Sequence, residues 1–334
     1  MVKQDDIAKI LNISRTTVAR ALNGSGSISL DTKEKILKLC EELGYSRNPI
    51  STSLALKKKR NIYAFIVKTR NLNYSKEIKQ GFKRAQKEFE FYKCQLNIIE
   101  TDIDKPEEQL ELLNNIIKTE DVEGIIITPL LKDEIKRVKK DNPKITFIAL
   151  DLPLDDFTYS VCSNYFKSGR ITADILLNVL NNGDKILLID TDDDRISSKL
   201  SFNGFLSKVK ESDKCEIVGP IYQKSLKDNI EACLDENLTE DIKAIYSSRF
   251  LVNIVKSICK RKKYHIKVVD NGTSDITKEL IKNNKIVATV AQKYSELGYL
   301  AAKNMFEYLC KDIKPLKINN ELDSVILFKE NFMS

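Results

Sequence analysis

Apolar residues recur at helical spacing in three short stretches near the N-terminal end. They predict helices over residues 6–12, 14–23 and 29–43, because positions i, i+3, i+4 and i+7 share one helix face. Ser14 and Ser29 precede the second and third helices and are suitable N-caps. The first two helices are joined by a very short connection, which is typical of a helix-turn-helix. The apolar positions are Ile7, Ile10 and Leu11; then Val18, Ala21 and Leu22; then Ile36, Leu39, Cys40 and Leu43.

From residue 61 onward, short apolar runs alternate with amphipathic stretches. This alternation predicts parallel sheets with right-handed helical crossovers, and in such sheets ligands bind at the carboxyl ends of the strands. The expected strands are 62–67, 95–99, 124–128, 145–150, 185–190, 217–221, 244–247, 266–269 and 287–290. The expected helices are 75–91, 106–119, 132–140, 168–181, 200–210, 228–235, 251–261, 274–283 and 296–310.

The charge of the chain is concentrated at one end. The net charge is +7 over 334 residues, and residues 1–60 hold 12 Lys and Arg against 6 Asp and Glu. The other residues are nearly neutral. A local excess of positive charge favours a polyanion such as DNA as partner, although a solvated charged face has the same composition. A run of basic residues, Lys57-Lys-Lys-Arg60, has the composition of a linker.

Residues suited to catalysis or metal binding are scarce. The seven cysteines are scattered without a C-x-x-C pair, so neither a disulfide framework nor a zinc site is expected. His265 is the single histidine, which argues against a multi-histidine metal centre. The acidic run Asp190–Asp194 is interpreted as a solvated loop. No phosphate-binding loop or nucleophile elbow is present, so we expect no enzyme activity, no cofactor and no metal.

Neither an apolar stretch of membrane-spanning length nor a signal-peptide core is found. Together with the scattered cysteines, this predicts a cytoplasmic protein with no membrane partner.

The stretch from Asp6 to Ala55 resembles the N-terminal domain and hinge of LacI/GalR-family transcription regulators. The resemblance rests on Asp6-Ile7-Ala8, Thr17-Val18, Leu22-Asn23-Gly24, Leu43-Gly44-Tyr45 and Asn48. It implies that the second helix enters the major groove of DNA and that a leucine of the hinge wedges into the minor groove. The DNA-contacting residues that it implies are Ser14, Arg15, Thr16, Thr17, Arg20, Asn23, Leu54 and Ala55.

The remainder resembles periplasmic-binding-protein-like effector domains, which have two Rossmann-like lobes and a ligand cleft between them. The resemblance rests on Gly81-Phe82, Gly124–Pro129, Ser168-Gly169, Asn203-Gly204-Phe205 and Gln292–Gly298. The cleft residues that it implies are Tyr74, Asp151, Asn164, Ser201, Ser247, Asn271 (alternatively Asp270) and Gln292. Ser201 stands where the family usually has a sugar-contacting arginine, and Asn164 stands where an acid is common. The ligand therefore need not be a common neutral sugar.

The expected fold is an all-α helix-turn-helix head followed by a type I periplasmic-binding-protein-like α/β domain. The domains would be the head at 1–47, a hinge and linker at 48–60, and the effector-binding and dimerisation domain at 61–334. Its first lobe would hold 61–162 and 290–318, and its second lobe 163–289 and 319–334. The resemblance implies a homodimeric repressor that binds a pseudo-palindromic operator under control of a small molecule, which is expected to be a sugar or a sugar derivative. The alternative is a constitutive DNA binder whose effector domain is insensitive to ligand.

Overall fold

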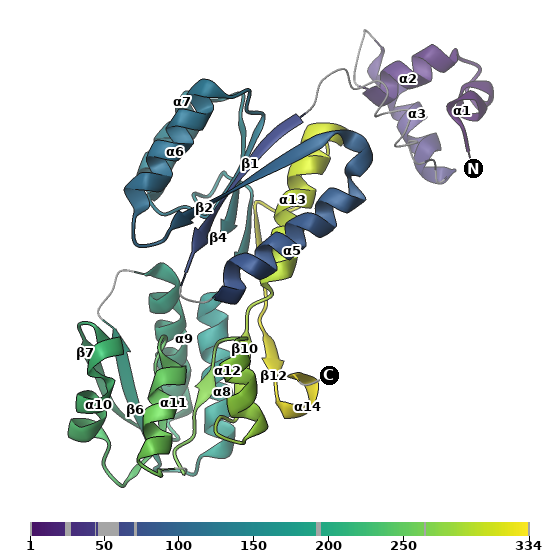
Figure 1. Cartoon of the computed structure of the whole chain (residues 1–334). Coiled ribbons are helices and arrows are strands. Elements are labelled where there is room, and N and C mark those ends of the chain that lie inside the picture. The colour runs from purple at the N-terminus through teal and green to yellow at the C-terminus, as the bar shows by residue number, and fades with distance from the viewer. Residues whose placement is uncertain are drawn as a thin grey trace. The chain divides into compact units, whose positions relative to one another are not determined.

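The computed structural model divides into two compact units, a small N-terminal head and a large unit that begins at Arg60 (Figure 1). Each unit is described by itself. The structure describes residues 2–23, 28–43, 45, 60–69, 72–191, 195–263 and 265–332. The expected hinge at 48–60 lies outside these residues, apart from Arg60.

The head is built from three helices, as the sequence predicts: α1 (Gln4–Ile10), α2 (Arg15–Asn23) and α3 (Leu30–Glu42). The Ser14 hydroxyl accepts the backbone N–H of Thr17 at 3.0 Å, and Ser29 caps α3 in the same way. These caps satisfy backbone donors that have no partner within the helix. The apolar faces meet in one small core, formed by Ile7, Ala8, Val18, Ala21, Ile36 and Cys40.

The first lobe of the large unit contains a six-stranded parallel sheet in the order β11-β5-β4-β3-β1-β2. Its buried strands are short, nearly continuous apolar runs, as expected for a sheet covered on both faces. The strands are β1 (Arg60–Lys68), β2 (Cys94–Asp102), β3 (Gly124–Ile127), β4 (Thr146–Asp151), β5 (Ser160–Ser163) and β11 (Asn319–Leu322). The helices are α5 (Leu72–Glu88), α6 (Pro106–Thr119), α7 (Lys132–Asp141) and α13 (Tyr294–Lys311), and a short 3-10 turn, η1 (Glu90–Tyr92), follows α5 in the sequence.

The second lobe contains two three-stranded sheets, β7-β6-β8 and β12-β10-β9, joined by a parallel bridge between Ala244 and Lys267. Among the strands of the described residues in this lobe, β12 alone runs antiparallel to its neighbour, β10. The strands are β6 (Lys185–Thr191), β7 (Glu216–Gln223), β8 (Ile242–Tyr246), β9 (Val269–Asp270), β10 (Ala288–Ala291) and β12 (Val325–Leu327). The helices are α8 (Tyr165–Val179), α9 (Ile196–Ser212), α10 (Leu226–Asn237), α11 (Leu251–Lys260), α12 (Asp275–Lys282) and α14 (Lys329–Phe332).

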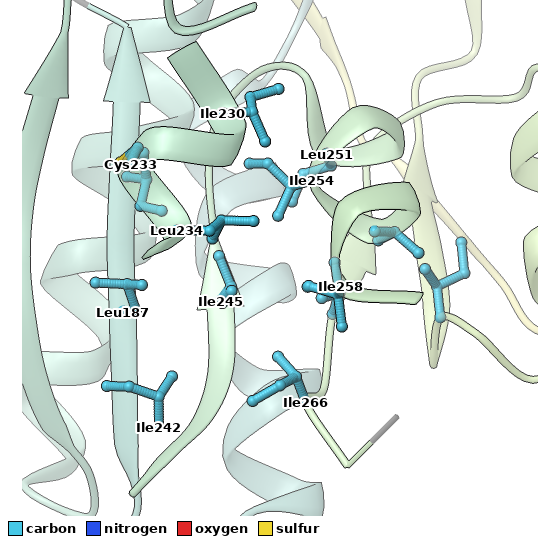
Figure 2. Packing of buried hydrophobic residues seen from close by; sticks show 14 of the residues in the cluster. Leu187, Ile230, Cys233, Leu234, Ile242, Ile245, Leu251, Ile254, Ile258 and Ile266 are labelled. Atoms are coloured by element: carbon cyan, nitrogen blue, oxygen red, sulfur yellow. The ribbon is translucent and has the colours of Figure 1, made fainter. Parts of the chain in front are cut away.

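Aliphatic side chains fill the space between the sheet and its helices in the second lobe. Figure 2 shows Leu187 and Ile245 from two strands facing Leu234 of α10 and Ile258 of α11. All four are at most 3% exposed. This dry packing holds the strand ends in place.

The chain crosses between the lobes three times, and the crossings differ from those that the sequence suggested. They lie after β5, after β10 and after β11. Residues 319–322 were expected in the second lobe, but they pair with β5 in the sheet of the first lobe. Residues 290–291 were expected in the first lobe, but they belong to β10. Segments this short carry no lobe-specific periodicity, so strand pairing alone decides their lobe.

Two helix pairs approach closely at glycines that the resemblance to the effector domain includes. A Cβ atom on Gly81 of α5 would lie 2.0 Å from the Ser295 carbonyl oxygen of α13. A Cβ atom on Gly169 of α8 would lie 1.9 Å from the Ser201 carbonyl oxygen of α9. Only glycine permits backbones to pack at this distance.

The elements that the sequence did not predict are β5, β11, β12 and α14, each of three or four residues. They are shorter than the window in which periodicity can be recognised. No helix in the described part of the chain is both long and apolar enough to span a bilayer.

Candidate functional site

The second helix of the head presents a basic, hydroxyl-bearing face. Arg15, Thr16 and Arg20 are exposed on α2, while Val18 and Ala21 are buried against the other helices. The Arg15 guanidinium lies 3.8 Å from the Asp5 carboxylate. Both side chains are more than half exposed, so this pair contributes little. Arg15 therefore remains available to an anionic partner.

The other residues with an expected DNA contact fall into two groups. Ser14 and Thr17 form the N-terminal cap of α2, and their hydroxyls are 2.8 Å apart. The side chain of Asn23, and the whole of Leu54 and Ala55, lie outside the described residues.

The large unit contains a cavity of about 620 Å³ between its lobes. Its walls are formed where strands of both lobes end, at Thr128 and Asp151 in the first lobe and at Tyr246 and Asp270 in the second. Polar groups at strand ends thus surround a space of the size that takes a small molecule.

Asp151 is the most constrained polar group of the first-lobe wall. Its carboxylate accepts the Ser163 hydroxyl at 2.8 Å and the Tyr165 hydroxyl at 2.8 Å, and it is 6% exposed. Burial raises the pKa of Asp151, and the hydroxyl donors partly offset that effect. Its backbone has φ of 68°, in the left-handed region that few non-glycine residues occupy. Such backbone strain is concentrated at functional sites.

Three tyrosines gather around this carboxylate. Tyr74 packs edge-to-face on Tyr294 with ring centroids 4.8 Å apart, and Tyr165 completes the group. Burial, and then the negative charge of Asp151, raises the pKa of all three hydroxyls. All three therefore remain protonated, and the wall combines aromatic surface with hydroxyl groups.

The second lobe holds two further buried carboxylates, of which Asp270 lines the cavity. Asp190 accepts the Ser248 hydroxyl at 2.8 Å, and Asp270 accepts the Thr277 hydroxyl at 2.7 Å. Burial raises the pKa of each aspartate. The interpretation of Asp190–Asp194 as a solvated loop is wrong for Asp190, which is only 4% exposed, and Asp192–Asp194 lie outside the described residues.

Gln292 connects the chain crossings at the edge of the cavity. Its amide nitrogen donates to the Ser168 hydroxyl at 2.9 Å, and its amide oxygen accepts the Ser324 hydroxyl at 3.2 Å. Asn164 caps α8 and donates to Glu321 at 2.7 Å. Side-chain hydrogen bonds thus link the segments of chain that pass between the lobes, and a ligand at Gln292 could alter these bonds.

The lobes also touch on either side of the cavity. Arg195 of the second lobe donates to the Asp104 carboxylate of the first lobe at 2.7 Å. The Asn73 amide donates to the Thr273 carbonyl oxygen at 2.9 Å, and the Thr273 hydroxyl donates to Glu77 at 3.0 Å. These contacts hold the lobes together around the cavity.

The structure brings together five of the seven expected cleft residues. Tyr74, Asp151, Ser201, Asn271 and Gln292 line the cavity, and so does the alternative, Asp270. The expectation that Asn164 and Ser247 face the cavity is not met. Asn164 instead caps α8 and donates to Glu321. Ser247 is fully buried, and its hydroxyl donates to the Arg249 carbonyl oxygen.

Sequence reasoning missed several cavity residues that lie next to expected ones. Tyr165 follows Asn164, Ser248 follows Ser247, and Tyr294 is two residues beyond Gln292. A one-residue error at a strand end moves the side chain to the other face. The missed cavity residues could have been found by considering the residues next to each expected position.

Across the described ranges, no group of three or more His, Cys, Asp or Glu side chains has an arrangement that could hold a metal ion.

Two family models match the chain. Residues 4–48 match the model for bacterial regulatory proteins of the lacI family, and residues 63–312 match a periplasmic binding protein domain. Among solved structures, a periplasmic ribose ABC transporter protein from Conexibacter woesei superposes with a TM-score of 0.70 at 19% identity. That match covers 82% of this chain and 93% of the other, and it establishes the fold.

Curated relatives are similar over shorter stretches. The Bacillus subtilis (strain 168) protein named "Probable HTH-type transcriptional repressor ExuR" is 48% identical over 71 residues, which is 21% of each chain. The catabolite control protein A of Priestia megaterium is 26% identical over 183 residues, 54% of this chain and 52% of its own. The chain thus spans from about a fifth to about half the length of these relatives. The chain belongs to the family of periplasmic binding protein domains, whose model covers most of its length, and its N-terminal head is similar to the lacI family of bacterial regulatory proteins over residues 4–48.

Proposed function

We propose that this protein is a sequence-specific DNA-binding transcription repressor whose affinity for its operator is controlled by a small molecule in the inter-lobe cavity. The observation that carries the DNA-binding part is the exposed basic face of α2 in a capped three-helix head that matches the lacI family model. The word "repressor" in the name of a relative that is 48% identical over this region supports the direction of control.

In the proposed complex, α2 enters the major groove. Arg15, Thr16 and Arg20 contact base edges or phosphates, while the hydroxyls of Ser14 and Thr17 lie at the end of the helix that approaches the backbone. Asn23 supports the backbone contact. Two copies of the chain would place two such helices on the half-sites of an inverted repeat, so a homodimer is part of the proposal.

Leu54 and Ala55 complete the proposal at the centre of the operator. An apolar side chain inserted at a base step of the minor groove kinks the duplex, and the added contact offsets a cost of about a few kcal/mol. Support for this part comes from the family resemblance alone.

The effector is proposed to be a sugar or a sugar derivative. The cavity of about 620 Å³ combines tyrosine rings with carboxylates at strand ends, which suits a small polyhydroxylated molecule. Tyr74, Asp151, Ser201, Asn271 and Gln292 are the proposed contacts. The serine at position 201 contributes no positive charge, so this site differs from one built around an arginine there.

The proposed control follows from the position of the cavity between lobes that are joined by three crossings. A ligand that contacts both walls favours one arrangement of the lobes over another. It can shift the equilibrium only by the difference between its affinities for the two arrangements. By reciprocity, operator DNA changes the affinity for the effector by the same factor.

DNA binding can be tested by fluorescence anisotropy on an inverted repeat selected from a randomised library. We expect Arg20→Ala to weaken binding at least tenfold and to reduce the dependence on salt. Lys38→Ala is the matched control, because Lys38 is an exposed cation of the same head on α3. Equal weakening by both variants would show that only the charge of the head matters and would contradict the proposed docking.

Effector control can be tested by thermal-shift screening of sugars, sugar acids and sugar phosphates, followed by anisotropy with each stabilising compound. A stabilising compound that also changes the operator affinity supports the proposal. Tight operator binding together with no stabilising compound in a broad panel would instead favour a constitutive repressor with a degenerate cavity.

A further inference from the structure

Two cysteines that are far apart in the sequence meet at one edge of the first lobe. Cys94 is the first residue of β2, and Cys310 is the last but one residue of α13. Their sulfur atoms are 2.9 Å apart, across 216 positions of sequence, and both residues are partly exposed thiols. In the described part of the chain, no other two cysteine sulfurs are in such contact.

A guanidinium group lies beside the pair. Arg60 of β1 is directly opposite Cys94 in the parallel register of the two strands, and it also binds the Glu123 carboxylate. Positive charge next to a thiol favours the thiolate, which is the reactive form of cysteine. The pair therefore has an environment that can stabilise one negative charge.

The hydrogen bond between the two sulfurs shifts their pKa values in opposite directions. The hydrogen bond from Cys94, and then the charge of Arg60, lowers the pKa of Cys310. The same hydrogen bond and burial raise the pKa of Cys94, which keeps its proton. This difference in pKa favours Cys310 as the nucleophilic sulfur and Cys94 as the neighbouring thiol that resolves an oxidised intermediate.

Three of the other cysteines have raised pKa values. Burial raises the pKa of Cys162 to about 12, and it raises the pKa values of Cys215 and Cys233 as well. Raised pKa values make these thiols poor nucleophiles at neutral pH.

We propose that Cys94 and Cys310 form a redox-active dithiol that a hydroperoxide oxidises to an intramolecular disulfide. The Cys310 thiolate attacks one peroxide oxygen, so that an S–O bond forms and the O–O bond breaks. The released hydroxide takes up a proton and becomes water. Cys94 then attacks the Cys310 sulfur, the S–S bond forms, and the S–O bond breaks. The second hydroxide leaves as water with the Cys94 proton. The two sulfurs lose two electrons in total, which reduce hydrogen peroxide to two waters.

The disulfide would join the start of β2 to the end of α13. Both elements belong to the first lobe, so the link closes a loop of more than two hundred residues without tying one lobe to the other. Cross-linking a loop of this length restricts the unfolded chain. We therefore expect the oxidised protein to unfold at a higher temperature than the reduced protein.

The experiment treats the full chain with hydrogen peroxide, quenches the reaction, and counts thiols after unfolding. We expect seven thiols before and five after oxidation, with recovery to seven after dithiothreitol. Peptide mapping under non-reducing conditions should recover a peptide pair that contains Cys94 and Cys310. No loss of thiols, or a linked pair of other cysteines, would overturn the proposal.

Single substitutions test the assigned roles. Cys94→Ser should leave a Cys310 sulfenic acid that dimedone traps, whereas Cys310→Ser should give little trapping at Cys94. Cys259→Ser is the matched control, because Cys259 is also partly exposed, and it should still lose two thiols on oxidation. Trapping mainly at Cys94 would overturn the assignment of Cys310 as the nucleophile, and far-UV circular dichroism confirms that each variant is folded.

Discussion

Replacing Tyr165 by phenylalanine tests whether hydroxyl donors stabilise the buried Asp151 carboxylate. The substitution retains the ring, so apolar packing changes little. It removes the hydroxyl, which donates to both carboxylate oxygens at 2.8 Å. Ser163 still donates to the same carboxylate. The perturbation is therefore the loss of one hydrogen bond to a buried charge.

The expected magnitude follows from the burial of both groups. A hydrogen bond to a charged group contributes about 1.5–3 kcal/mol to stability. For a unit of this size, each kcal/mol shifts the melting temperature by roughly 2–4 °C, so we expect melting to fall by about 3–12 °C at pH 7.5. The Tyr165 hydroxyl also holds down the pKa of Asp151, and its loss should raise that pKa further.

The assay is thermal and urea unfolding of the full chain at pH 7.5 and pH 4.5. The folded-state pKa of Asp151 is raised above its ordinary value of 3.8. The hydrogen bond from Tyr165 favours the ionised form of Asp151. Its contribution to stability is therefore present above the folded-state pKa of Asp151 and declines as the pH falls through that pKa. Tyr308→Phe is the control, since the described contacts of Tyr308 include a ring contact with Tyr159 and no carboxylate.

Two results would refute this reasoning. One is a Tyr165→Phe variant that is as stable at pH 7.5 as the Tyr308→Phe control. The other is an equal loss of stability at both pH values, which would mean that the hydroxyl does not act through the charge of Asp151.

Three further predictions concern single residues. Ser14→Ala removes the hydroxyl that caps the Thr17 N–H and should destabilise the head by about 1 kcal/mol. Thermal unfolding monitored by circular dichroism measures this loss, and an unchanged stability would show that the cap is dispensable. The stability of Asp151→Asn relative to wild type should increase as the pH rises above 4, because burial raises the pKa of Asp151 and ionising that buried carboxyl costs stability. Urea titrations from pH 4 to 8 measure the difference in unfolding free energy between the two proteins. A difference that stays constant with pH would contradict the reasoning. Gly169→Ala should destabilise the large unit by about 1–3 kcal/mol or more, because the Cβ of the alanine would lie 1.9 Å from the Ser201 carbonyl oxygen. An unaffected melting temperature would show that α8 and α9 can separate at little cost.

Much of the fold could be predicted because its signals are local. The caps at Ser14 and Ser29 and the apolar stripe of α3 lie within one or two helical turns. The alternation of strands and helices is equally local, and it predicted a parallel α/β architecture, which the fold comparison confirms. Asp151 and Gln292 were expected at the cavity because the resemblance to effector domains implies it, and both line the cavity.

The errors concern segments whose partners are distant in sequence. Residues 319–322 were assigned to the wrong lobe, because a four-residue strand is defined by its neighbour β5 rather than by its own pattern. Asp190 was interpreted as solvated, because a run of acids has the composition of a loop. In the fold Asp190 is buried and accepts a hydrogen bond from Ser248, which is 58 positions away.

The sequence by itself thus determined the class of each domain and the basic face of α2, since periodicity and capping act between residues a few positions apart, and the family resemblance supplied most of the expected cavity residues. Only the tertiary structure decided which strands pair, where the chain crosses between the lobes, how Tyr74, Tyr165 and Tyr294 surround Asp151, and that Cys94 meets Cys310. The physical reason is that these groups come together through sheet order and helix packing, which depend on the joint burial of many residues and leave no pattern in any short stretch.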